Sequence, residues 1–353
     1  MKTRIVADRA RLCENAETIL GWCREHGVSA AFVGKCICAD PALVPEVLKT
    51  GFVAYADSRE ENLRQAPDEY PHLMLRIGDP AQAGEIVASA DISQQSELVT
   101  VKALAEAAAR AGKRHKIVLM IDLGDLREGI FYENREELLT VAKAVVAESS
   151  LELYGTGVNL TCYGSIIPDE TNLGHLVELT EWLRKETGAA IPMISGGNSS
   201  SLGLLRAGRV PAGVNFLRIG EAVLLGTDTA TGGKVPELHD DAFVLEAPIV
   251  ELKVKPSMPV GTCSVNAFGE VVTYEDKGPM LRAILAVGRQ DIDPDGLTPL
   301  DEGAEIIGGS SDHLLVDVTR VSGLRVGDTL RFKLSYGALL KAYTSRYIEK
   351  AVK

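Results

Sequence analysis

The sequence predicts a (β/α)₈ barrel over residues 1–230, followed by an all-β domain over residues 231–353 that ends in a short helix. Two patterns carry this prediction. Short apolar runs alternate with helix-patterned segments through the first two thirds of the chain, which is typical of parallel α/β folds. Beyond Thr227 the helical pattern fades, and short β-like runs separated by turns replace it. A chain of 353 residues also favours two domains over one.

The first barrel strand is expected at residues 30–33, an apolar run that ends at Gly34, after an amphipathic helix at residues 9–26. Seven further strands are expected at residues 52–56, 73–77, 90–93, 116–122, 153–159, 192–195 and 216–219, with helices at residues 41–50, 59–65, 97–111, 136–148 and 173–187 among them. No glycine-rich dinucleotide fingerprint follows any of these strands. Eight alternating strands therefore favour a closed barrel over an open sheet.

The second domain begins after a linker at residues 232–236, which reads GGKVP. Its strands are expected at residues 243–252, 271–273, 281–287, 305–307, 314–318 and 329–333. Turns at residues 293–296 and 326–328 separate some of them.

Composition narrows the classes of partner. The formal net charge is −12, which disfavours nucleic acid and anionic membranes, because both reward clustered Lys and Arg. No apolar signal core and no run of membrane-spanning length is present. The six cysteines lack regular spacing, and Cys36 and Cys38 lack the gap of a metal knuckle, so we expect reduced thiols, no metal site and a cytoplasmic location.

Lys35 lies where the first strand ends, and the carboxyl ends of barrel strands form the usual active-site face. Two interpretations are open for it. Lys35 can be an ordinary strand-end lysine in solvent. Alternatively, apolar neighbours desolvate its amine, which can then form a Schiff base.

Residues 195–201, which read SGGNSSS, and residues 218–221, which read RIGE, follow the seventh and eighth strands. Loops at these positions commonly bind phosphate in barrels, since backbone N–H groups and hydroxyls are free there. A phosphate site opposite Lys35 predicts pyridoxal 5′-phosphate, which carries both an aldehyde and a phosphate. Arg218 would then face the pyridine nitrogen, unless it pairs with a carboxylate such as Glu221.

Several segments extend this interpretation along nearly the whole chain: GKCICADP, YADSREENL, ADISQQSE, IDLGDLREG, GVNLTCYG, SGGNSSSL, NFLRIGEAVLLG, AFG, GRQDIDPDGLTPLDEG, GSSDH and SYGALL. Together they resemble the alanine/ornithine racemase family of fold-type III pyridoxal-phosphate enzymes. The resemblance implies the barrel of that family, a small-molecule amino acid as substrate, and a head-to-tail homodimer in which the β domain of one chain completes the partner's active site.

The same resemblance implies that Lys35 binds the cofactor covalently and acts as one catalytic base. It implies further cofactor contacts by Arg127, Asn159, Asn198, Ser199, Arg218, Gly220, Glu221 and Tyr347. Arg127 would reach the phenolic oxygen of the cofactor or the substrate carboxylate, and Ser311 and Asp312 would also contact substrate.

Racemisation by two bases needs a second proton donor across Cα from Lys35. His313 is our first candidate, because histidine titrates near neutral pH. A structural role in the β domain is the other interpretation of His313. Asp312, Cys263, Tyr274 and Tyr163 are alternative second bases.

Three positions differ from the better-known alanine racemases. Ala39 stands where those enzymes have a tyrosine after the lysine, Asn159 stands in place of a histidine, and residues 261–268 hold no counterpart of their second-base tyrosine. These differences disfavour alanine as substrate. The resemblance implies ornithine or another basic amino acid, whose distal ammonium Asp125, Glu128 or Glu221 could hold. The alternatives are an alanine or broad-specificity racemase and a non-catalytic pyridoxal-phosphate-binding homeostasis protein.

Overall fold

A computed structural model describes residues 2–266 and 268–353. The chain divides into two compact units: a barrel unit, Arg9–His239, and a β unit, Met1–Asp8 with Asp240–Lys353. The sequence predicts this boundary between residues 230 and 231. Residues 227–239 stay with the barrel unit because Thr227 forms a β-bridge with Lys234 and because Asn15 exchanges hydrogen bonds with the backbone of His239.

The barrel unit closes as predicted. Its parallel strands are β2 (Ser29–Val33), β3 (Ala54–Asp57), β4 (His72–Met74), β5 (Ile92–Gln95), β6 (His115–Asp122), β8 (Leu151–Gly157), β9 (Met193–Ser195) and β10 (Phe216–Ile219). The order around the sheet is β5-β4-β3-β2-β10-β9-β8-β6, and pairing of β5 with β6 closes it. A short strand, β7 (Ile130–Phe131), adds to β6.

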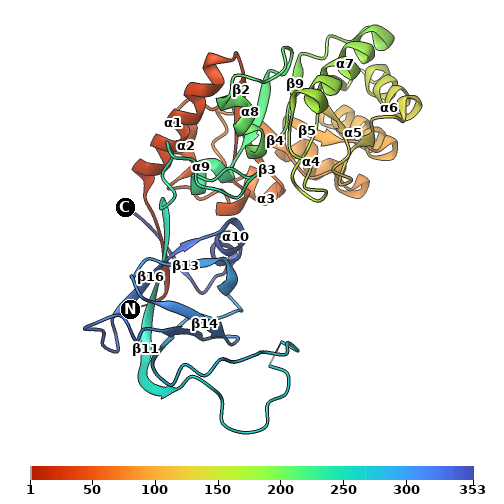
Figure 1. Cartoon of the computed structure of the whole chain (residues 1–353). Coiled ribbons are helices and arrows are strands. Elements are labelled where there is room, and N and C mark those ends of the chain that lie inside the picture. Colours follow the sequence, from red (N-terminus) through yellow and green to blue (C-terminus); the bar gives the residue numbers. More distant parts are fainter. Residues whose placement is uncertain (1, 267) are drawn as a thin grey trace. The chain divides into compact units, whose positions relative to one another are not determined.

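Helices follow the barrel strands along the chain (Figure 1). They are α1 (Arg9–Glu25), α2 (Val44–Lys49), α3 (Glu60–Leu63), α4 (Ala83–Ser89), α5 (Leu98–Ala111), α6 (Arg135–Ala147), α7 (Glu170–Thr187), α8 (Leu202–Arg206) and α9 (Glu221–Leu225), with 3₁₀ turns at Lys35–Ile37, Pro80–Gln82 and Ser199–Ser201. Capping follows the sequence locally: the Asp169 side chain accepts from the Asn172 N–H at the start of α7, and Gly188 ends that helix in the left-handed conformation.

Two apolar clusters stabilise the barrel unit. One consists mainly of alternate strand residues, including Ala31, Ala56, Met120 and Phe216, as expected for side chains that point into a barrel. The larger cluster joins the opposite faces of the strands to helices α4 to α7. Together they fix the strands from both sides, so the strand ends form a rigid platform.

The β unit is an antiparallel sheet with one peripheral parallel pair. Its elements are β1 (Arg4–Ala7), β11 (Phe243–Pro256), β12 (Pro279–Leu285), a 3₁₀ turn (Pro294–Gly296), β13 (Leu297–Pro299), β14 (Glu305–Gly309), β15 (Leu314–Asp317), β16 (Thr329–Leu334), α10 (Tyr336–Thr344) and β17 (Glu349–Val352). The sheet order is β13-β16-β11-β12-β15-β14, while β1 pairs antiparallel with β11 and parallel with β17.

One expected strand is absent, and one observed strand was not expected. Residues 271–273 form no strand: Val271 makes an isolated bridge to Val265 and is 83% exposed, so the apolar residues there bury no face. They belong to the long connection between β11 and β12, residues 257–278 (Figure 1). Conversely, the sequence analysis expects no strand at residues 4–7 and includes them in the barrel range 1–230, whereas β1 forms there and Ile5 and Ala7 are buried in the β unit. Within the AFG motif, Ala267 lies outside the described residues.

Candidate active site at the barrel mouth

Lys35 opens the 3₁₀ turn that follows β2, at the carboxyl end of the strand, as the sequence predicts. The neighbouring strand β10 runs parallel to β2, with Arg218 opposite Ala31 and Ile219 opposite Phe32. Burial raises the pKa of the Glu221 carboxyl, while the Thr229 and Thr227 hydroxyls and the positive charge of Lys35 act in the opposite direction. The ends of β2 and β10 thus bring Lys35 and Glu221 into one electrostatic environment.

Two glycines allow the backbone to pack closely around Lys35. A Cβ atom at Gly34 would lie 2.5 Å from the Tyr55 hydroxyl oxygen, and one at Gly220 would lie 2.8 Å from the Val33 carbonyl oxygen. Neither glycine has a positive φ, so the need for glycine here is one of space. The backbone of β10 therefore reaches the residues just before Lys35.

Tyr55 and Asp57 on β3 form a buried pair that the sequence analysis missed. The Tyr55 hydroxyl donates to Asp57 Oδ2 at 2.8 Å, and Asp57 Oδ1 accepts from the N–H groups of Ser58 at 2.7 Å and Arg59 at 3.1 Å. Burial raises the pKa of Asp57 in spite of these donors. Burial, together with the charge and the hydrogen bond of Asp57, also raises the pKa of Tyr55. An alternating polar pair within an apolar strand, Tyr55 and Asp57, was the available signal.

The Ser/Gly-rich loop after β9 meets the end of β10. The Asn198 side chain accepts from the Ser200 N–H at 2.8 Å and begins the 3₁₀ turn that carries Ser199. Ser199 Oγ is buried and accepts from the N–H groups of Gly220 and Ala222, both at 3.3 Å. One hydroxyl and two backbone donors are therefore grouped where a phosphate was predicted.

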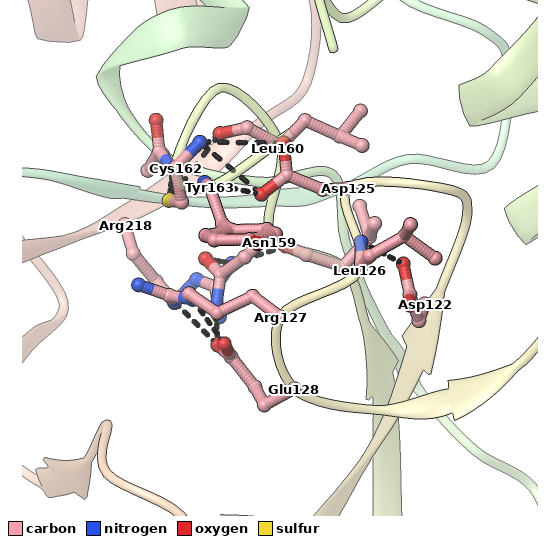
Figure 2. Close-up of polar contacts among 12 residues, drawn as sticks. Asp122, Asp125, Leu126, Arg127, Glu128, Asn159, Leu160, Cys162, Tyr163 and Arg218 are labelled. Carbon is pink, nitrogen blue, oxygen red and sulfur yellow. Dashed lines mark hydrogen bonds and ion pairs between the residues drawn. The ribbon is translucent and has the colours of Figure 1, made fainter. Parts of the chain in front are cut away.

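Arg218 is fully buried in a polar network (Figure 2). Its Nη2 donates to the carbonyl oxygen of Val158 and, at 2.9 Å, to Asn159 Oδ1. Asn159 Nδ2 in turn donates to Glu128, which also accepts from Arg127 Nε and Nη2. Burial lowers the pKa of Arg218 to about 10, and the negative charge of Glu128 offsets part of that effect.

The carboxylates proposed to hold a distal ammonium already have other partners. Buried Asp125 accepts from the N–H groups of Cys162, Tyr163 and Ile166 and so anchors the loop after β8 (Figure 2). Glu128 is shared by Arg127 and Asn159. Glu221 accepts from the hydroxyls of Thr227 and Thr229.

One independent observation indicates that these residues could bind pyridoxal phosphate. Nη1 of Arg218 is buried and finds no hydrogen-bond partner among the described residues. A buried donor without a partner costs folding free energy, about 1–3 kcal/mol, and is usually explained by a ligand or an ordered water. An unprotonated pyridine nitrogen is an acceptor of the right kind, since arginine can only donate.

The remaining predicted residues belong to the β unit. Ser311, Asp312 and His313 lie in the turn between β14 and β15, which is closed by a 2.8 Å bond from the Ser310 N–H to the His313 carbonyl. Asp312 Oδ1 lies 3.3 Å from His313 Nδ1, and all three residues are exposed. Tyr347 is exposed too, and its hydroxyl accepts from Arg346 Nη2 at 2.8 Å.

The alternative second bases have exposed side chains. Tyr163, held by its N–H to Asp125, is 74% exposed in the barrel unit. Cys263 and Tyr274 lie on the long connection between β11 and β12. Among the described residues the cysteines are free thiols, no His, Cys, Asp and Glu side chains group as a metal site would require, and no helix is long and apolar enough to cross a membrane.

Comparisons with known proteins place this geometry in context. Residues 8–228 match the family described as "Alanine racemase, N-terminal domain". The chain is 44% identical over 352 residues to the ornithine racemase of Acetoanaerobium sticklandii, an alignment that covers 99% of each chain. It is 35% identical over 350 residues to the lysine racemase of Thermotoga maritima, covering 98% of this chain and 97% of the relative.

Solved structures show the same fold. The alanine racemase of Bartonella henselae, determined with covalently bound pyridoxal phosphate, superposes with a TM-score of 0.74, and the match covers 100% of both chains at 14% identity. At that identity the likeness supports the two-part architecture, a barrel with an antiparallel β domain.

Proposed function

The chain belongs to the alanine racemase family, and we propose that it interconverts the L- and D-enantiomers of ornithine, with pyridoxal 5′-phosphate as its cofactor. It is an amino-acid racemase, and therefore an isomerase, that acts on a basic amino acid. The observation that carries the choice of ornithine is the 44% identity with an ornithine racemase over 99% of both chains. The lysine racemase is the more distant of these two relatives, at 35%.

The barrel mouth supplies groups for each part of the cofactor. Lys35 would bind the aldehyde carbon, while Ser199 Oγ and the N–H groups of Gly220 and Ala222 would bind the phosphate. The unpartnered Nη1–H of Arg218 would donate to the ring nitrogen. Asn198, which orders the Ser199 turn, and Asn159 and Glu221 complete the set from the barrel. Tyr347, in the β unit, is the further cofactor contact that the family resemblance implies.

When bound, the cofactor withdraws electrons from the amino acid and makes its Cα–H acidic. Arg218 stays protonated, so it would keep the ring nitrogen an acceptor and limit that withdrawal, which favours rapid return of the proton. Arg127 would orient the substrate through its carboxylate, because a guanidinium binds a carboxylate by two parallel hydrogen bonds.

Racemisation needs a proton removed from one face of Cα and another returned to the opposite face. We assign the first face to Lys35 Nζ and the second to His313 of the partner subunit, with Ser311 and Asp312 beside it. Exposure of the turn between β14 and β15 supports this assignment, since an exposed turn is free to meet a second chain. The enzyme is then a head-to-tail homodimer. A cytoplasmic location agrees with the six cysteines being outside disulfides.

The test is replacement of Lys35 with alanine in the full-length, cofactor-loaded protein. After borohydride reduction, mass spectrometry should find the cofactor mass on Lys35 of the wild type, whereas Lys35→Ala should carry no label and form no D-ornithine. Lys49→Ala, which alters an exposed lysine paired with Glu46 on α2, is the matched control and should resemble wild type. A Lys35→Ala protein that still racemises would exclude this assignment.

A further inference from the structure

Glu128 joins the two arginines of the barrel mouth. One carboxylate accepts from Arg127 Nε and Nη2 on one side and from Asn159 Nδ2 on the other (Figure 2). Asn159 continues the chain, because its Oδ1 accepts from Arg218 Nη2 at 2.9 Å. Arg127 and Arg218 are thus connected through a single negative charge.

The loop that carries Glu128 is held at both ends. Asp122 Oδ1, at the end of β6, accepts from the N–H groups of Gly124 at 2.9 Å and Leu126 at 3.1 Å. Gly129 has a φ of +119°, and a Cβ there would lie 2.7 Å from the Asp122 nitrogen, so only glycine fits this return of the chain. Glu128, between these anchors, has a side chain only 16% exposed.

The direction of each hydrogen bond in this network is determined by chemistry. A guanidinium can only donate and a carboxylate can only accept. Asn159 must therefore present its oxygen to Arg218 and its NH₂ group to Glu128. A neutral amide in place of the carboxylate would accept from Asn159 and Arg127 more weakly and would place an NH₂ group beside these donors, so the constraint on Arg218 Nη2 would loosen.

The negative charge of Glu128 also indicates that this residue holds the two arginines in place. Arg218 is buried, with only 2% of its surface exposed, and a buried cation is stable only where compensating negative charge or hydrogen bonds are near. Glu128 acts favourably on both Arg218 and Arg127. Among the carboxylates considered for a distal ammonium, it is the one bound to an arginine of the proposed site.

We propose that Glu128 is a positioning residue, which holds Arg127 for the substrate carboxylate and, through Asn159, holds Arg218 for the cofactor ring nitrogen. This inference rests on the proposed function. It replaces the idea that Glu128 binds the distal ammonium of the substrate, because both of its oxygens are already engaged within the chain.

The experiment compares Glu128→Gln, Asn159→Ala and wild type as full-length proteins. Glu178→Gln, on an exposed face of α7, is the matched control. Four quantities are measured: the dissociation constant for pyridoxal phosphate added to the cofactor-free protein, the pH dependence of the visible absorption of the bound cofactor, and KM and kcat for L-ornithine.

Glu128→Gln should bind pyridoxal phosphate more weakly and raise KM, each by about tenfold to a hundredfold, as expected for loss of charged hydrogen bonds. It should also shift the pH dependence of the absorption, which a purely structural role would leave in place. Asn159→Ala should reproduce the cofactor effects but raise KM less than Glu128→Gln does, since Arg127 keeps Glu128. The double variant should bind pyridoxal phosphate no more weakly than whichever single variant has the lower affinity for it.

The outcomes separate this inference from the function beneath it. If wild type binds cofactor and racemises while Glu128→Gln keeps the wild-type KM and absorption, the positioning role is wrong and the proposed function stands. If wild type binds no pyridoxal phosphate, both fail. Should Glu128→Gln not fold, Asn159→Ala decides: unchanged cofactor affinity and absorption in that variant overturn the link to Arg218.

Discussion

Substitution of Gly220 by alanine tests how closely β10 must approach Lys35. The added Cβ would lie 2.8 Å from the Val33 carbonyl oxygen and 2.9 Å from Val33 Cβ, whereas ordinary contact begins at 3.4 Å. The two strands would have to separate by about 0.6 Å, at the point that leads directly into Gly34 and Lys35. Both obstructing atoms belong to a rigid strand end, so relief by rotation of a flexible side chain is excluded.

Overpacking of this kind costs roughly 1–3 kcal/mol of stability. The same shift would move the Gly220 N–H, which donates to Ser199 Oγ, away from the proposed phosphate position. We therefore expect Gly220→Ala to unfold at a lower urea concentration and to bind pyridoxal phosphate at least about tenfold more weakly, equivalent to about 1.4 kcal/mol.

Gly174→Ala provides the matched control, because Gly174 lies inside helix α7 and a Cβ there would meet no atom within 4 Å. Alanine in a helix interior is favoured over glycine, so this variant should gain about 0.5–1 kcal/mol. Urea unfolding of the cofactor-free proteins and titration with pyridoxal phosphate measure both effects. A Gly220→Ala protein as stable as wild type, with wild-type cofactor affinity, would refute the packing argument.

Three further substitutions test the buried polar groups. Tyr55→Phe removes a donor from buried Asp57 and should cost about 1.5–3 kcal/mol in urea unfolding; an unchanged midpoint would contradict the pairing. Asp125→Ala should speed amide hydrogen exchange at residues 162, 163 and 166, whose N–H groups donate to Asp125, and equal protection would show that other contacts hold the loop. Burial lowers the pKa of His115 to about 4, so unfolding below pH 6.5 takes up a proton. The contribution of neutral, buried His115 to the free energy of unfolding is complete above pH 6.5 and is lost as the pH falls toward 4, by about 3 kcal/mol in all. His115→Gln should therefore lose that part of the pH dependence of stability.

The barrel could be predicted from sequence because its signal is local. Each strand is a short apolar run that ends in a polar loop, and Gly34 marks the end of the run that precedes Lys35. Position alone then placed Lys35, Ser199, Arg218 and Gly220 at one mouth, because carboxyl ends of parallel strands share one face.

The polar network could not be predicted in this way. Arg218 and Asn159 are 59 residues apart, and Asn159 and Glu128 are 31 apart, so their contacts depend on barrel closure and on side-chain rotamers. The same limit explains β1, whose four residues pair with β11 more than 200 positions away. Residues 271–273 show the opposite error, since a run with strand composition need not bury any face.

The central claim is racemisation of a basic amino acid with pyridoxal phosphate, and one incubation tests it most directly. The cofactor-loaded protein is mixed separately with L-ornithine, L-lysine or L-alanine in deuterium oxide, while NMR follows exchange at Cα and chiral chromatography follows the enantiomers. The account predicts D-ornithine with deuterium at Cα and little or no change in alanine. Bound cofactor without exchange or D-form from L-ornithine or L-lysine would contradict it.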